Sequence, residues 1–167
     1  MLGRLVYRLI EKLYLSKPNN LAFYCQKTLV YNQNWWELYA KKHLESESFN
    51  IVILDLNNFK QYNDNFGHLM GDNLLRSFAH RLKLTFGDGF ICRVGGDEFV
   101  ILTNYSEGEI IGKLRILKDY NFSFGISYKS KTTLLDEAYV DADMKMYSYK
   151  AYSKECLLSG KKARNNN

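Results

Sequence analysis

The chain has 167 residues, of which 46% are hydrophobic and 15% aromatic. This size and composition predict one domain with its own core, and they exclude disordered, collagen-like and disulfide-stapled chains. Lysine and arginine outnumber aspartate and glutamate by 23 to 18, and the net charge of +5 suits an anionic ligand without requiring one. The longest apolar run, residues 51–54, has the length of a strand and not of a membrane span.

The three cysteines, Cys25, Cys92 and Cys156, are scattered and form no Cys-x-x-Cys pair. We interpret them as reduced packing residues. The first residues, Met1–Arg4, lack the apolar centre and cleavage site of a signal peptide, so we expect a cytoplasmic protein.

Residues 2–15 carry apolar side chains at the spacing of one helix face. Two interpretations are open: a helix that packs on its own domain or pairs with a second copy, and a basic helix that lies on a membrane surface. We favour packing or pairing, because an isolated helix of this length is marginal in water. Residues 16–20 contain Pro18 and end this helix. Residues 20–46 predict a second helix, with an Asn-rich stretch at 32–34 that could split it.

From residue 50 onward the pattern is β-α-β-β-α-β-α. The predicted elements are a buried strand at 50–56, a helix at 71–86, a turn at 87–89, a hairpin of strands 90–94 and 98–103, a helix at 106–118, a strand at 122–128 and a helix at 133–152. This order predicts an α+β fold whose antiparallel sheet has split βαβ connections and helices on one face.

Acidic residues stand at two unusual places in this order. Asp55 lies near the end of an apolar strand, where an unpaired carboxylate is costly, and Asp97 and Glu98 follow two glycines at the hairpin tip. If the two strands are neighbours, Asp55 and Asp97 converge at one sheet edge, where carboxylates would suit a hard cation such as Mg²⁺. The alternative is that Asp97 and Glu98 are only polar turn residues.

Four motifs, in the same order along the chain, resemble the GGDEF family, the diguanylate cyclases. Arg93–Leu102 resembles the signature hairpin, and Asp55–His68 with Gly71 and Asp72 resembles the first metal and phosphate segment. Ser123–Ile126 and Ala142–Lys150 resemble the last strand and helix. The resemblance covers residues 13 to 154 and implies a palm-like sheet with flanking helices, related to nucleotidyl cyclases.

The family condenses two GTP molecules into cyclic di-GMP and releases two pyrophosphates. The resemblance implies that Asp55, Asp97 and the carbonyl of Leu56 hold Mg²⁺ or Mn²⁺. It implies that Glu98 serves a second metal or handles the proton of the 3′-hydroxyl. Gly95 and Gly96 would let the backbone lie close to the nucleotide.

The resemblance also assigns the contacts to GTP. Asn63 and Asp72 would read the guanine edge, and Asp72 argues for GTP over ATP because a carboxylate only accepts hydrogen bonds. The implied phosphate contacts are Lys60, the backbone N–H groups of Asn58 and Phe59, and Lys150 and Lys154, four residues apart on one helix. The implied catalytic residues are Asp97, Glu98 and Lys60.

Catalysis in this family needs two domains that face each other, so we expect a homodimer. The predicted organisation is a helix at 1–15 that helps to pair the copies, a catalytic domain at 16–158 and a flexible tail at 159–167. Nucleic acid is not an expected partner, because no basic face with interleaved aromatic residues is evident.

Four features depart from the family pattern. Asn57 replaces a second acidic residue, and the turn at residues 13–20 is a residue shorter and lacks its Asp and Arg. Residues 86–89 lack the Arg-x-x-Asp of the inhibitory product site, and the segment from Phe99 to Ser123 is shortened. Two alternatives therefore stay open: a catalytically weak GTP-binding regulatory module, and a related cyclase that makes another cyclic dinucleotide or oligonucleotide.

Overall fold

The computed structural model describes residues 22–87 and 89–164, although not the side chains of His43 and residues 153–164. The predicted helix at residues 2–15 and the break at 16–20 lie outside this part of the chain. The described elements are β1 (Tyr31–Asn32), α2 (Gln33–Trp35), the π-helix η2 (Trp36–Ala40), α3 (Lys41–His43), β2 (Phe49–Leu56), α4 (Phe59–Phe66), α5 (His68–Thr85), β3 (Phe90–Arg93), β4 (Glu98–Thr103), α6 (Glu107–Arg115), β5 (Phe122–Lys129) and α7 (Leu135–Arg164).

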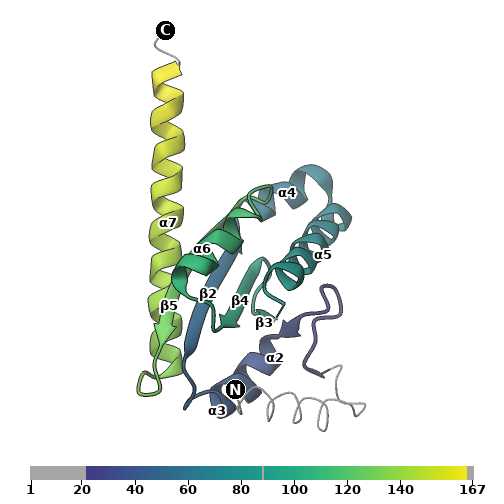
Figure 1. The fold of residues 1–167 in the computed structure, drawn as a ribbon. Coiled ribbons are helices and arrows are strands. Elements are labelled where there is room, and N and C mark those ends of the chain that lie inside the picture. The colour runs from purple at the N-terminus through teal and green to yellow at the C-terminus, as the bar shows by residue number, and fades with distance from the viewer. Residues whose placement is uncertain (1–21, 88, 165–167) are drawn as a thin grey trace.

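Five strands form one sheet in the order β1-β3-β4-β2-β5 (Figure 1). Strand β2 is antiparallel to both of its neighbours, β4 and β5, and β3 is antiparallel to β4. The β4–α6–β5 connection therefore joins two strands with β2 between them, which is the split βαβ arrangement. The short β1 pairs in parallel with β3, so the sheet is mixed. The predicted α+β fold is confirmed.

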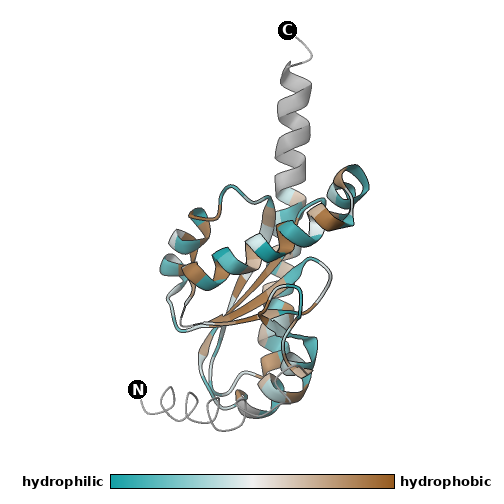
Figure 2. Cartoon of the chain, turned by 90° about the vertical axis from the view of Figure 1, so that its right-hand side faces the viewer, coloured by the Kyte–Doolittle hydropathy of each residue, from teal (hydrophilic) through white to brown (hydrophobic). Residues whose placement is uncertain are grey.

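Helices cover both faces of the sheet, so the prediction of helices on one face was wrong. Helices α5 and α6 pack on one face, over β2 residues such as Val52 and Leu54. Segments α2, η2 and α7 pack on the other face, over Ile51 and Ile53. Figure 2 shows the apolar strands as a layer between the two sets of helices. The cause is the unbroken apolar run of β2, because neighbouring strand residues point to opposite faces and both faces must be buried.

The helix predicted over residues 20–46 is wrong in its first half. Residues 24 and 31 form a β-bridge, and the Cys25 N–H donates to the carbonyl of Val30 at 2.8 Å, which closes a turn. The first α-helix of the described residues begins after Asn32, whose side chain accepts from the Trp35 N–H at 3.1 Å. Asn32 therefore acts as an N-cap at the Asn-rich stretch where the sequence suggested a split.

Two helices differ in extent from the predictions. Residues 59–66 form α4, for which no element was predicted, and Gly67 at φ 83° separates it from α5. Helix α7 runs to Arg164 instead of ending at residue 152, and it extends beyond the sheet (Figure 1). It therefore takes in residues 159–164 of the predicted tail. The hairpin, the strands at β2 and β5, and helix α6 agree with the sequence within a few residues.

A buried lysine joins β5 to the loop before β2. Lys129 is fully buried, and its ammonium donates to the carbonyl oxygens of Glu45, Glu47 at 3.1 Å and Ser130 at 3.2 Å. These carbonyls have no place in the sheet ladder, so the lysine satisfies backbone acceptors that burial would otherwise leave unpaired.

We expect Lys129→Met to lower the free energy of unfolding by about 2 kcal/mol, because it keeps the aliphatic volume but removes the donor to three carbonyls. Urea unfolding would measure the change. Lys131→Met, at an exposed position two residues away, is the matched control and should stay within about 0.5 kcal/mol of the unmodified chain. Equal effects of the two substitutions would contradict this role.

Candidate active site

Three carboxylates meet at one edge of the sheet. Asp55 lies near the end of β2 and pairs in register with Glu98, the first residue of β4. The Leu56 N–H donates to the carbonyl of Asp97 at 3.2 Å, which holds the hairpin tip against the end of β2. Strands β2 and β4 are neighbours, and their register brings Asp55 and Asp97 to the same sheet edge, as predicted. The exposed fraction of Asp55 is only 8%.

The carboxylates at this edge repel one another. Burial raises the pKa of Asp97, and the nearby Asp55 carboxylate raises it further. The pKa of Glu98 is raised by burial and then by the charges of Asp55, Asp97 and Asp143. Among the described side chains, the Lys150 ammonium on α7 is paired with this group, 2.6 Å from Asp55 Oδ1. The edge thus concentrates more negative charge than this one lysine balances.

We expect Asp97→Asn to raise the melting temperature at neutral pH. A carboxyl whose pKa is raised on folding stabilises the native state at pH values below its unfolded pKa. That contribution is lost as the pH rises through the folded pKa. The advantage of the variant should therefore shrink as the pH falls toward 4 and Asp97 becomes protonated in the unmodified chain. Thermal unfolding across this pH range tests it, and a gap independent of pH would contradict it.

The hairpin tip is held by Arg93, whose guanidinium donates to the carbonyl of Gly96 at 2.6 and 3.2 Å. A Cβ added at Gly95 would lie 2.5 Å from Glu98 Oε2, so the Glu98 side chain folds back over this glycine. A Cβ at Gly96 would meet nothing within 4 Å. Of these two glycines, a side chain at Gly95 would require the Glu98 carboxylate to move, whereas the predicted reason for Gly96 depends on a bound nucleotide.

Helix α4 follows β2 and begins close to this edge. Asn58 precedes it at φ 59°, a conformation that Asn tolerates better than most residues, and no side chain caps the helix. The first N–H groups of α4 are thus without intrahelical partners, which makes this end suited to an anion. Lys60, the other predicted phosphate contact here, is exposed.

The two residues predicted to read guanine lie next to each other. The Oδ1 atom of Asn63 on α4 is buried and has no hydrogen-bond partner. A Cβ at Gly71 would lie 1.8 Å from that atom, so α5 contacts Asn63 at this glycine, and Asp72 is the next residue of α5. An unpaired buried acceptor beside a carboxylate is suited to a ligand that presents several N–H donors.

One residue at this place was missed by the sequence analysis. The Lys27 ammonium, from the turn of residues 25–30, lies 2.8 Å from Asp72 Oδ1. This ion pair is the first cause that lowers the pKa of Asp72, ahead of the charges of Arg76 and Arg93. Residues 45 positions apart carry no local signal of such a contact.

Asn57, where the family has an acidic residue, is hydrogen-bonded to Asn121, just before β5, and to Ser123 in β5. Its amide donates to Asn121 Oδ1 at 3.0 Å, and its oxygen accepts from the Ser123 hydroxyl at 2.9 Å. An amide serves this arrangement well because it both donates and accepts. These side-chain hydrogen bonds of Asn57 go to neither Asp55 nor Asp97.

Of the two lysines of α7 that were predicted to contact the phosphates, the structure describes the side chain of one. Lys150 pairs with Asp55, so its ammonium lies at the carboxylate edge. Lys154 is four residues further along α7, among the side chains that the structure does not describe.

The oxygen atoms at this edge could hold a hard cation only if water molecules supplied further ligands. Among the described side chains, no group of three or more His, Cys, Asp and Glu is placed to hold a metal ion. Two carboxylates and a backbone carbonyl nevertheless match the preference of Mg²⁺, which keeps several waters and takes one or two protein carboxylates. Burial first and the neighbouring carboxylates next raise the pKa values of Asp97 and Glu98, and a bound cation would offset the repulsion between these carboxylates.

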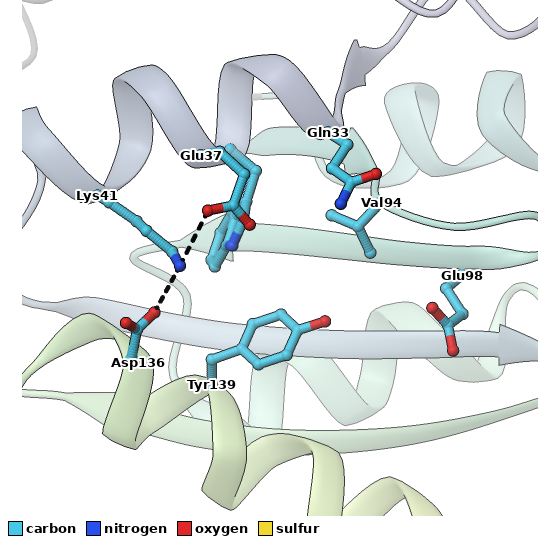
Figure 3. A pocket seen from close by; sticks show the side chains of 8 residues that line it. Gln33, Glu37, Lys41, Val94, Glu98, Asp136 and Tyr139 are labelled. Atoms are coloured by element: carbon cyan, nitrogen blue, oxygen red, sulfur yellow. Dashed lines mark ion pairs between the residues drawn. The ribbon is translucent and has the colours of Figure 1, made fainter.

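A pocket of ≈ 260 Å³ opens on the α7 side of the sheet, with Glu98 at one end (Figure 3). Lys41 bridges Glu37 at 3.0 Å and Asp136 at 3.1 Å at its other end. The Tyr139 hydroxyl points into the space between, and burial together with the Glu98 charge raises the pKa of Tyr139 to about 12. Neither Asn63 nor Asp72 lines this pocket, so it is separate from the predicted guanine site.

The fold and the motifs of this chain match those of a known family. Residues 22–118, more than half of the chain, match the family described as diguanylate cyclase, GGDEF domain. The chain belongs to the GGDEF family. The resemblance stated from the sequence is thereby confirmed.

Curated relatives of this GGDEF domain are longer proteins. Diguanylate cyclase DgcS of Shewanella oneidensis is 27% identical over 139 residues, which are 75% of this chain and 47% of DgcS. Signaling protein YkoW of Bacillus subtilis is 37% identical over 62% of this chain and 15% of YkoW. Cyclic di-GMP phosphodiesterase PdeR of Escherichia coli is 42% identical over 40% of this chain and 10% of PdeR. The chain spans about half or less of the length of these relatives.

Solved GGDEF domains have the same architecture. A microbial GGDEF domain described with bis-(3,5)-cyclic di-GMP is 28% identical, with a TM-score of 0.71 over 78% of this chain and 94% of that domain. The GGDEF domain of DgcB from Caulobacter crescentus is 19% identical, with a TM-score of 0.70 over 78% of this chain and 91% of that domain, which shows likeness of fold. No helix among the described residues is long and apolar enough to cross a bilayer.

Proposed function

We propose that this chain is a diguanylate cyclase that condenses two GTP molecules into cyclic di-GMP and two pyrophosphates. The observation that carries the proposal is the meeting of Asp55, Asp97 and Glu98 at one sheet edge, where burial first and repulsion between carboxylates next raise the pKa of Asp97 and Glu98. Family membership and relatives named diguanylate cyclases support it.

In this proposal Asp55, Asp97 and the Leu56 carbonyl hold Mg²⁺ or Mn²⁺, with Glu98 as a further acidic group. When bound, the ion would lower the pKa of the attacking 3′-hydroxyl and neutralise charge on the leaving pyrophosphate. Glu98, whose pKa is already raised, is suited to accept the proton of that hydroxyl.

The other residues bind and orient the nucleotide. The uncapped first turn of α4, with Lys60, would hold the terminal phosphates, and Lys150 would add positive charge from α7. Asn63 and Asp72 would hold the guanine edge. Each copy then binds one GTP, and the 3′-hydroxyl of one attacks the α-phosphate of the other, so the product forms between two copies that face each other.

Incubation of the purified chain with GTP, ATP or both, in Mg²⁺ or Mn²⁺, tests the proposal when products are identified by mass spectrometry. Cyclic di-GMP from GTP alone is the expected result. A mixed or adenine-only product would reject the guanine assignment and favour the related cyclase.

A GTP-binding regulatory module is the second candidate. The ion pair between Lys150 and Asp55 favours it, because this lysine competes with a cation for the buried carboxylate. PdeR, a relative named as a phosphodiesterase, contains a matching segment as well. GTP binding without any product at high protein concentration would support this candidate.

A further inference from the structure

We propose that Lys27 is a specificity residue of the guanine site and donates a hydrogen bond to O6 of the base. The inference rests on the proposed function, because it extends the guanine contacts of Asn63 and Asp72.

The turn that carries Lys27 is held in place from several sides. The Cys25 carbonyl accepts from the N–H groups of Thr28 at 3.3 Å and Leu29 at 2.8 Å. The Arg93 guanidinium donates to Cys25 Sγ at 3.4 Å, and Lys83 of α5 donates to the carbonyl of Leu29. The turn is therefore tied to Arg93 at the end of β3 and to α5, the helix that carries Asp72. Lys27 is thus presented to Asp72 by a hydrogen-bonded turn.

The ammonium of Lys27 has donors to spare. Its side chain is 55% exposed and that of Asp72 is 26% exposed, so a ligand can reach both. An ammonium has three N–H groups, and Asp72 Oδ1 receives one of them at 2.8 Å. The two other cations near Asp72 are engaged elsewhere, since Arg76 donates to Asn73 and Arg93 to Gly96.

The acceptor and the donors on the Watson–Crick edge of guanine lie in the same order as the Lys27 ammonium and the Asp72 carboxylate. Guanine presents the acceptor O6, then the donors N1–H and N2–H₂, so a carboxylate that accepts from N1–H and N2–H₂ has O6 beside it. A cation that touches Asp72 Oδ1 is therefore placed to donate to O6. Adenine presents a donor amine and an acceptor nitrogen at the corresponding positions, and it would face the ammonium and the carboxylate with the wrong groups.

The test compares binding of GTP, 6-thio-GTP and ATP, each in its 3′-deoxy form, which lacks the attacking hydroxyl. Calorimetric titration would use the unmodified chain, Lys27→Ala and Lys27→Gln, with Lys131→Ala, in the turn after β5, as an exposed control. Sulfur in place of O6 is a poor acceptor, while N1–H and N2–H₂ stay the same.

We expect Lys27→Ala to weaken binding of the GTP analogue about tenfold, the size of one charge-assisted hydrogen bond, and Lys27→Gln to weaken it less. The unmodified chain should prefer GTP over 6-thio-GTP, and Lys27→Ala should bind the two alike. Lys131→Ala should bind as the unmodified chain does.

Tighter GTP binding by Lys27→Ala would overturn the assignment, since Lys27 would then compete with the nucleotide for Asp72. Unchanged binding, or an unchanged preference between GTP and 6-thio-GTP, would overturn it as well, while the proposed function would stand. If the unmodified chain binds no guanine nucleotide, the proposed function and this assignment fail together. The melting temperatures of the variants would be measured as well, and values equal to that of the unmodified chain would show that the substitutions leave the protein folded.

Discussion

Asp97→Asn is expected to abolish the synthesis of cyclic di-GMP, with a fall in turnover of about 1000-fold or more, because it removes a carboxylate that would hold the metal ion beside the reacting phosphate. The substitution keeps the size of the side chain and relieves repulsion with Asp55, so the fold should be retained. GTP binding should persist in part, since Asn63, Asp72 and the first turn of α4 are separate from Asp97.

Product formation by mass spectrometry and nucleotide binding by calorimetry would be measured on the same preparations. Asp119→Asn, at an exposed position in the turn after α6, is the matched control and should leave both unchanged. Full synthesis by Asp97→Asn would reject the metal assignment. A loss of GTP binding equal to the loss of product would show instead that Asp97 acts mainly in holding the nucleotide.

Gly125→Ala is expected to lower the free energy of unfolding by about 3 kcal/mol, the upper part of the range for overpacked sites. A Cβ at Gly125 would lie 2.0 Å from the carbonyl oxygen of Ala142 and 2.4 Å from the backbone nitrogen of Met146. Both are backbone atoms of α7, so the whole helix would have to move away from β5. The melting temperature should fall by about 6–12 °C.

Gly112→Ala is the control for this substitution. A Cβ at Gly112, within α6, would meet nothing within 4 Å, so alanine should be neutral or stabilise the helix by about 0.5–1 kcal/mol. Because α7 also carries Lys150, displacement of the helix by Gly125→Ala should weaken the contact with Asp55 as well. A small effect of Gly125→Ala on unfolding would show that α7 is loosely held on the sheet.

Much of the site could be predicted because its residues lie in short local motifs. Asp97 and Glu98 follow two glycines, which predict a hairpin tip, and Asp55 ends an apolar run that predicts a central strand. Antiparallel pairing of neighbouring strands then brings their ends together, as the register of Asp55 with Glu98 shows. The roles of these residues toward metal and nucleotide stay predictions.

The contacts that tie distant segments together could not be predicted. Lys27 meets Asp72, Lys150 meets Asp55, and Lys129 reaches the carbonyls of the loop before β2, across 45, 95 and more than 80 residues respectively. An exposed lysine and a buried one look alike in a sequence, because the pattern records a residue type and not its neighbours.

The sequence by itself determined the strands after residue 50, the helices other than α4 and the acidic hairpin, because periodicity and turn residues act within a few positions of the chain. Its motifs also determined the resemblance to the GGDEF family. Only the tertiary structure decided that helices cover both faces and that residues 22–32 fold into a turn instead of a helix. It alone placed Lys27 beside Asp72. These outcomes depend on which surfaces are buried against each other, and that choice is made by the whole chain at once.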